Sequence, residues 1–126
     1  MVDLLRHKTG VLMPSLENSR TIGFDTVEMK LYFENNNHIS SAHLNGTKVE
    51  VIIKNANVGK LVIDWIGRRV FWTEYLLKRI SVANLDGKEK RVLANTIKNP
   101  HHIQIDPTTG FLFWTENGVI IRFNLA

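Results

Sequence analysis

Three aspartates stand out in this chain because their type and regular spacing could serve chemistry. Asp25, Asp64 and Asp106 lie 39 and then 42 residues apart, and each ends a short apolar segment. Gathered at one point, three carboxylates could bind a metal ion or exchange protons with a substrate. A catalytic site, however, brings unlike residues together, whereas a residue that recurs in a repeat serves what every repeat needs. We therefore interpret these aspartates as caps of turns between strands, and we predict no catalytic residue, metal ligand or cofactor.

An aromatic block follows each aspartate at the same distance. The blocks read LYFEN, VFWTE and LFWTE, and they end at Asn35, Glu74 and Glu116, ten residues after the aspartate in each case. A repeat of about 40–45 residues with a tryptophan-containing strand is the sequence pattern of propeller blades. Because the aromatic residues keep their place in every copy, we interpret them as packing residues between neighbouring blades, among them Phe33, Trp72 and Trp114.

Each copy is expected to form antiparallel strands, four to a complete blade, so the predicted fold is all-β, a propeller arc with an incomplete ring. The aspartate ends the first strand of a copy, and the aromatic block forms the second. The dipeptides Asn45-Gly46 and Asp86-Gly87 favour a hairpin between the third and fourth strands. Gly67 and Gly110 are expected to give the turns after the second and third aspartates their flexible backbone.

The repeat divides the chain into four parts. Complete blades are expected over residues 20–54 and 60–94, and a three-stranded blade over residues 101–126. Within residues 1–14 we expect the fourth strand of a preceding blade, at Thr9–Leu12. Three blades do not close a ring, so the chain is expected to be a fragment of a longer protein. The alternative is that two copies join head to tail, each adding its spare strand to the incomplete sheet of the other.

Composition argues against several other classes of protein. The 126 residues carry a formal charge of +4 and no cysteine, so they hold neither a disulfide framework nor a thiolate metal site. A charge this modest indicates no nucleic-acid partner. No apolar run reaches the length of a membrane span, so membrane contact would come through parts outside this chain. A Ser-His-Asp spacing, a glycine-rich phosphate loop and a zinc signature are all absent.

The FWTE block, followed by Ile80 and then by NLDG, resembles the YWTD repeat of the LDL-receptor class B propellers. That family closes six blades into a ring. The acid of its YWTD segment commonly pairs with a basic residue at the start of the third strand. The resemblance therefore implies a pair between Glu74 and Arg79, while His38 and Val119 occupy the matching basic position in the other two copies.

The resemblance also implies a function. It points to a non-enzymatic, extracellular or cell-surface module of a larger LDL-receptor-related receptor, which binds a protein ligand or packs against adjacent receptor modules. Two alternatives stay open. The arc could belong to the ectodomain of a Ros/sevenless-type receptor tyrosine kinase, or to a six-bladed propeller hydrolase with a metal-dependent site at its central channel.

The best sequence candidates for ligand contact lie in one turn of the second copy. Trp65 has Thr26 and Pro107 at the matching positions, so it is an aromatic residue that the repeat does not explain. Arg68 and Arg69 follow it closely. Tryptophan and arginine are enriched at the energetic centres of protein interfaces, and we therefore expect these three residues to contact a ligand.

A glycosylation sequon occurs at Asn45-Gly46-Thr47. It falls on the expected turn between the third and fourth strands of the first complete blade, where a glycan would disturb no packing. The same Asn-Gly pair is also favourable turn chemistry, so a purely structural role for Asn45 stays open.

Overall fold

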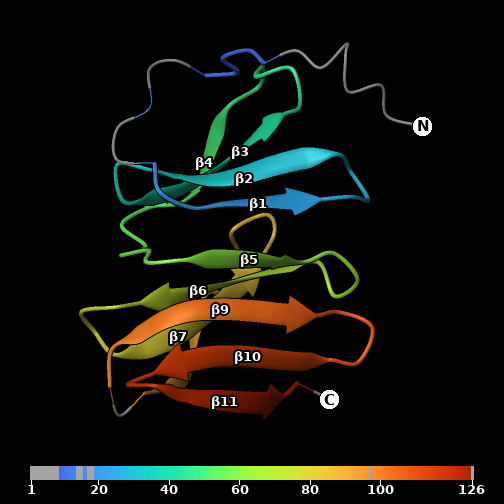
Figure 1. Cartoon of the computed structure of the whole chain (residues 1–126). Coiled ribbons are helices and arrows are strands. Elements are labelled where there is room, and N and C mark those ends of the chain that lie inside the picture. The colour runs from blue at the N-terminus through green and yellow to red at the C-terminus, as the bar shows by residue number, and fades with distance from the viewer. Residues whose placement is uncertain (1–8, 14–15, 17–18, 97, 126) are drawn as a thin grey trace.

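The computed structural model of the chain describes residues 9–13, 16, 19–96 and 98–125. Across these residues it contains eleven strands and no helix. The strands form three antiparallel sheets, and the sheets stack beside one another as an open arc (Figure 1). The predicted fold class, an all-β propeller arc, is confirmed. No helix of the described part is long and apolar enough to cross a membrane.

Two sheets have four strands and the third has three. The first sheet contains β1 (Ile22–Asp25), β2 (Lys30–Asn35), β3 (His38–His43) and β4 (Glu50–Ile53), in that order. The second contains β5 (Leu61–Asp64), β6 (Arg69–Glu74), β7 (Arg79–Asn84) and β8 (Arg91–Asn95). The third contains β9 (Pro100–Asp106), β10 (Phe111–Glu116) and β11 (Val119–Asn124). Each sheet is thus a simple up-and-down meander.

Equivalent residues of the repeat occupy equivalent places in the three sheets. In each sheet, the residue three positions before the aspartate lies opposite the central aromatic residue, which is Phe33, Trp72 or Trp114. Side chains alternate between the two faces of a strand, so this register turns all three aromatic side chains to the same face of their sheets. The repeat in the sequence is therefore a repeat of backbone pairing.

Two apolar clusters hold neighbouring sheets together. The cluster between the first and second sheets includes Tyr32, Ile39, Leu61, Val70 and Trp72. The cluster between the second and third sheets consists of Phe71, Ile80, Val82, Ile103, Leu112 and Trp114. Each large apolar side chain that is fully buried contributes about 2 kcal/mol to stability. Face-to-face packing of the sheets is therefore the main force that maintains the arc.

The turn after each aspartate corrects one expectation. In all three turns the fourth residue has a left-handed backbone, with φ of 55° at Met29, 59° at Arg68 and 75° at Gly110. Gly110 thus has the expected role, but Gly67 does not have a positive φ. Gly67 is needed for space, because a Cβ there would collide with Oδ2 of Asp64. A side chain in the left-handed region costs about 1–2 kcal/mol, and Met29 and Arg68 both carry this cost.

The segment Thr9–Leu12, which we predict as a strand, forms none in the structure. A strand exists only through hydrogen bonds to a neighbouring strand, and the structure pairs this segment with no described strand. Leu12 instead lies against the β3–β4 turn, where its carbonyl oxygen would be 2.8 Å from a Cβ on Gly46. Except for Met13, the rest of residues 1–14 lies outside the described residues.

Candidate functional site

The buried acid of the second aromatic block is the centre of a hydrogen-bond network. Trp72 donates from its indole nitrogen to Oε1 of Glu74 at 3.1 Å and to the carbonyl oxygen of Ala56 at 2.9 Å. Ser81 donates its hydroxyl to the same Oε1 at 2.8 Å, and Arg79 donates from Nε to Oε2. Arg79 thus occupies the place that the family resemblance implies. The network therefore connects β6 to β7 and to the β4–β5 connection.

The acid of the third block, Glu116, accepts its second hydrogen bond from a different donor. Trp114 donates to Oε1 of Glu116 at 3.0 Å, as its counterpart does in the second sheet. Val119 stands where the second sheet has its arginine, and the backbone N–H of Lys98 donates to Oε2 at 3.0 Å instead. In the first sheet, a fully buried Phe33 occupies the tryptophan position and cannot donate.

The three repeated aspartates cap turns, and they are not brought together. Each accepts a hydrogen bond from a backbone N–H two or three residues later, at 3.0 Å for Asp25, 2.9 Å for Asp64 and 3.1 Å for Asp106. Hydrogen bonds from Thr108 and Thr109 hold the pKa of Asp106 below its usual value. Within the described ranges, no group of three or more His, Cys, Asp or Glu residues could hold a metal ion.

Asp25 also binds an arginine of the next sheet. The guanidinium of Arg68 places its two terminal nitrogens 2.6 and 2.7 Å from the two carboxylate oxygens of Asp25. It also donates to Glu28 at 2.7 Å. The hydrogen bonds from Arg68 hold the pKa of Asp25 below its usual value, although burial acts in the opposite direction. The pKa of Arg68 is raised by the same contact.

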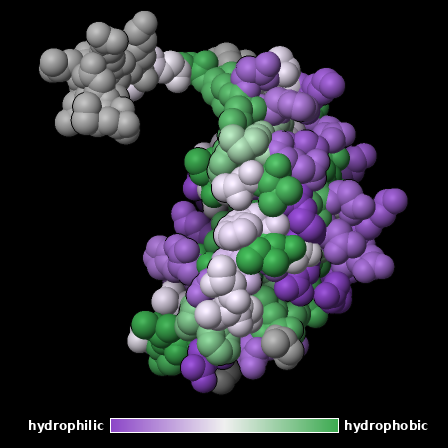
Figure 2. All heavy atoms as spheres, turned by 90° about the vertical axis from the view of Figure 1, so that its right-hand side faces the viewer, coloured by the Kyte–Doolittle hydropathy of each residue, from purple (hydrophilic) through white to green (hydrophobic). Residues whose placement is uncertain are grey.

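The sequence candidates for ligand contact do meet in one turn, between β5 and β6, but both arginines are engaged within the chain. Arg69 pairs with Asp64 at 2.9 Å and lies over the ring of Phe71, 5.2 Å from its centroid. Trp65 is half-buried against the first apolar cluster and lines a hollow of about 510 Å³ along β1, β5 and β9. Figure 2 views the molecule from this end of the sheets, where hydrophilic residues gather along one edge. Ligand contact at this turn stays a prediction.

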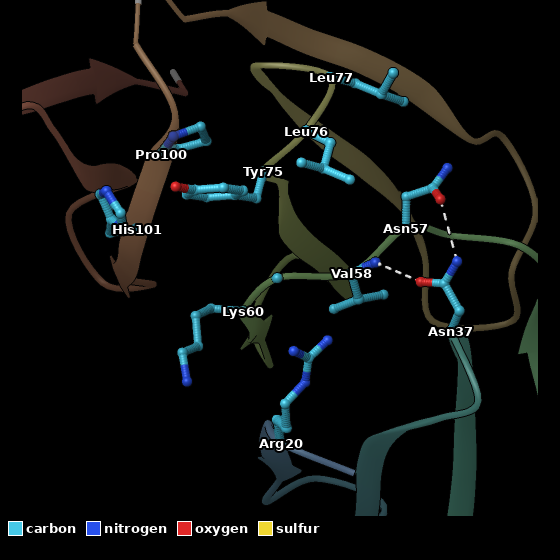
Figure 3. Close-up of a pocket in the computed structure, with 11 residues that line it drawn as sticks. Arg20, Asn37, Asn57, Val58, Lys60, Tyr75, Leu76, Leu77, Pro100 and His101 are labelled. Atoms are coloured by element: carbon cyan, nitrogen blue, oxygen red, sulfur yellow. Dashed lines mark hydrogen bonds between the residues drawn. The ribbon is translucent and has the colours of Figure 1, made fainter. Parts of the chain in front are cut away.

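The larger pocket lies at the opposite end of the sheets. It has a volume of about 600 Å³ and is lined by the β2–β3 and β6–β7 turns, the β4–β5 connection, the start of β9 and Arg20 before β1 (Figure 3). Three consecutive side chains of the β6–β7 turn, Tyr75, Leu76 and Leu77, belong to its apolar lining. Leu76 is 84% exposed and Leu77 is 48% exposed, although leucine is usually buried. The pocket therefore presents unusually accessible apolar surface.

Hydrogen bonds fix one wall of this pocket. Asn37 donates from Nδ2 to Oδ1 of Asn57 at 3.1 Å, and its own Oδ1 accepts the backbone N–H of Val58 at 3.2 Å. On the other side the ring of Tyr75 contacts His101 edge-on, with 5.2 Å between the ring centroids (Figure 3). The pocket is thus largely formed before any ligand binds.

Positive charge accompanies the apolar surface. Arg20 and Lys60 line the pocket, and among the described residues that line it none is acidic. Arg20 is largely exposed and also forms an ion pair with the buried Glu34, with 3.6 Å between Nη2 and Oε2. This combination suits a ligand that carries both apolar side chains and carboxylates.

The repeat in the sequence does not indicate this pocket. Its residues come from turns and connections that differ between copies, whereas the repeat draws attention to what the copies share. One signal was present: the second copy has Tyr-Leu-Leu-Lys at residues 75–78, where the first and third copies have the two-residue turns Asn36-Asn37 and Asn117-Gly118. Strand pairing does not require apolar residues in a turn, so their insertion there indicates another role.

Comparisons with known proteins agree with this architecture. No family model matches the chain. Low-density lipoprotein receptor-related protein 5 of Mus musculus is 30% identical over 115 residues, which is 86% of this chain and 7% of that protein. The chain therefore spans only a small part of this relative.

Two solved structures share the fold. One chain of a nidogen/laminin complex matches with a TM-score of 0.70 and 36% identity, over 78% of this chain and 39% of that chain. A gluconolactonase from Xanthomonas campestris matches with a TM-score of 0.69, over 90% of this chain and 40% of that chain. At 16% identity the second match shows the fold alone. This chain is therefore homologous to the YWTD propellers of the LDL-receptor class B family, of which it holds about three blades.

Proposed function

We propose that this chain is part of an extracellular, non-enzymatic propeller of an LDL-receptor-related protein and that it binds a protein ligand at the pocket beside Tyr75. The observation that carries the proposal is the pocket itself, which joins exposed leucines to cationic side chains with no acid among its described lining residues. Such a surface is costly to leave in water, and a bound partner would cover it.

The chemistry of the pocket defines the ligand. Leu76 and Leu77 offer the apolar centre of an interface, and Arg20 and Lys60 offer its charged rim. An extended peptide segment with one apolar side chain flanked by aspartate or glutamate would satisfy both. Burial of one leucine side chain on binding contributes about 1.5 kcal/mol, and a carboxylate at the rim adds specificity and speed of association.

The comparisons support protein recognition as the task. The mouse relative is a receptor-related protein, and the nidogen match comes from a complex with laminin. Neither observation names the ligand of this chain, because the chain covers a minority of each relative. The ligand proposed here is therefore defined by its chemistry.

The test is a selection of peptides from a displayed random library on the purified chain. We expect the selected peptides to be rich in acidic residues beside a single large apolar residue. Leu76→Ser and Lys60→Glu should each weaken their binding by about tenfold, since each removes about 1.4 kcal/mol of contact. Selected peptides without acidic residues, or peptides that bind both variants as well as the parent chain, would contradict the proposal.

Matched control variants separate this pocket from a general effect of charge or hydrophobicity. Val27→Ser removes an exposed apolar side chain, and Lys88→Glu reverses an exposed charge, both at the other end of the sheets. Both variants should bind the selected peptides as the parent chain does. The prediction for Trp65, Arg68 and Arg69 is tested in the same assay.

A second candidate is assembly, and it rests on the exposed outer side of the third sheet. Ile120 is 74% exposed, whereas Ile39 and Ile80, at the same register in the other sheets, are fully buried against the next sheet. A further blade from a second copy could cover it in a head-to-tail dimer. Sedimentation velocity should then show a dimer that Ile120→Ser dissociates. A chain that stays monomeric at every concentration would exclude this assembly.

A further inference from the structure

We infer that Asn45 is a site of N-linked glycosylation and that the glycan leaves the candidate ligand pocket open. This inference rests on the extracellular location proposed above. Asn45 and Thr47 are both exposed at the tip of the β3–β4 turn, and neither lies within a strand. A glycan on this turn would therefore displace no packed residue.

The second sheet contains the same turn without the sequon, and it shows what the turn itself requires. In the first sheet the backbone N–H of Thr47 donates to Oδ1 of Asn45 at 3.1 Å. In the second sheet the backbone N–H of Lys88 donates to Oδ1 of Asp86 at 2.9 Å. The glycines that follow Asn45 and Asp86 have φ of 81° and 87°. The backbone path is thus the same with either residue.

The turn consequently needs only one side-chain oxygen at this position, and aspartate supplies it. The amide nitrogen of Asn45 makes no hydrogen bond to the residues that the structure describes, so turn geometry does not account for it. Turn geometry also does not account for the hydroxyl of Thr47, because Lys88 holds the same place in the second sheet. The amide nitrogen and the hydroxyl are the two groups that a sequon adds.

The hydroxyl and the amide are arranged together. Thr47 donates from Oγ1 to Oδ1 of Asn45 at 2.5 Å. This bond occupies the amide oxygen, which also accepts the backbone N–H of Thr47, and it leaves Nδ2 as the free end of an exposed side chain. In the modification, Nδ2 forms a bond to the anomeric carbon of a lipid-diphosphate-linked oligosaccharide. The bond from that carbon to the diphosphate oxygen breaks, the diphosphate leaves with the electron pair, and Nδ2 loses one proton.

The position of the turn separates the glycan from the pocket. Strand β3 connects the two sites, since Asn37 immediately before it lines the pocket and the sequon turn follows its other end. Six residues of strand span about 17 Å from first to last. The glycan would therefore project from the end of the sheets shown in Figure 2, and a ligand could bind at the opposite end.

The test is expression of the full chain with an export signal in a eukaryotic secretory system, followed by intact mass measurement before and after treatment with peptide N-glycosidase. The parent chain and Thr47→Ser should each lose the mass of one glycan. Asn45→Asp and Thr47→Ala should show no change, and Asn45→Asp should keep the turn because aspartate holds it in the second sheet. The measurement is made on secreted and retained chain alike, so poor secretion does not hide the result.

A positive control comes from the twin turn. A variant with both Asp86→Asn and Lys88→Thr should carry one additional glycan. A parent chain that stays unmodified overturns the inference, whether or not the double variant gains a glycan. Glycosylated and enzyme-treated chain should bind the selected acidic peptides with the same affinity within twofold, and a tenfold difference would overturn the separation of the two sites. Peptide binding by unglycosylated chain tests the proposed function independently.

Discussion

Arg68 of the second sheet donates two hydrogen bonds, of 2.6 and 2.7 Å, to the buried carboxylate of Asp25 in the first sheet. The two residues are 43 positions apart in the sequence. The matching turn of the third sheet has Gly110 at the place of Arg68, so the equivalent pair cannot form between the second and third sheets. This ion pair therefore joins the first and second sheets, and it has no counterpart between the second and third sheets.

Removal of this arginine should strongly destabilise the chain. Arg68→Met keeps the apolar stem but leaves the carboxylate of Asp25 buried without its charged partner. We expect the free energy of unfolding in urea to fall by about 3 kcal/mol. Arg122→Met is the control, since Arg122 is exposed and lies over the ring of Phe111. Equal losses in the two variants would contradict the role given to the Arg68 pair.

The same pair predicts how stability depends on acid. The pKa of Asp25 is lower in the folded chain than in the unfolded chain, so the folded chain holds its proton less tightly. The stabilisation is therefore complete above about pH 4, the ordinary range of aspartate, and it is lost as the pH falls through the lowered pKa. Unfolding free energies measured from neutral pH to pH 2 should decline more steeply in the parent chain than in Arg68→Met. Parallel curves would contradict this account.

Tyr32 predicts an alkaline limit as well. Burial raises its pKa to about 12, whereas an unfolded tyrosine titrates near pH 10. The neutral phenol is thus favoured in the folded chain, and its stabilisation is fully present below about pH 10 and is lost as the pH rises toward 12. Tyr32→Phe should lack this alkaline loss when unfolding is followed against pH. A variant whose alkaline decline equals that of the parent chain would refute the assignment.

The two tryptophans of the FWTE blocks should differ in what they contribute. Trp72 is fully buried and donates to two acceptors, whereas among the described residues the indole of Trp114 donates only to Glu116. Trp72→Phe should lower the free energy of unfolding by about 3 kcal/mol. The variant leaves the buried carbonyl oxygen of Ala56 without its donor and weakens the network around Glu74. Trp114→Phe should cost about half as much. A phenylalanine ring fits at this position, because Phe33 lies at the same register in the first sheet. Thermal or chemical unfolding of the two variants measures the difference between their losses of stability.

Much of the fold could be predicted from the sequence because blade structure is local. Alternating strands, turn dipeptides and the aromatic blocks each depend on residues near one another, and the repeat supplies three views of the same unit. The exception is Thr9–Leu12, which resembles a strand in spacing but has no described partner strand. The residue pattern of one segment does not show whether a second strand lies beside it.

The sites were harder to predict, because they depend on contacts between sheets. Arg68 is an attractive ligand contact in sequence, since nothing local shows that Asp25 of another blade engages it. The pocket likewise combines Arg20, Lys60, Tyr75 and His101 from separate connections that no periodicity relates. Only the assembled arc brings such residues together.

The most direct test of the account is a charge-reversal cycle with one selected acidic peptide. Its dissociation constant is measured with the parent chain and with Lys60→Glu, and again after the acidic residue of the peptide is replaced by lysine. We predict that each single reversal weakens binding by about tenfold and that the double reversal restores much of the loss, because opposite charges meet again. Dissociation constants that stay unchanged on Lys60→Glu, or losses that simply add, would show that the ligand does not bind at this pocket.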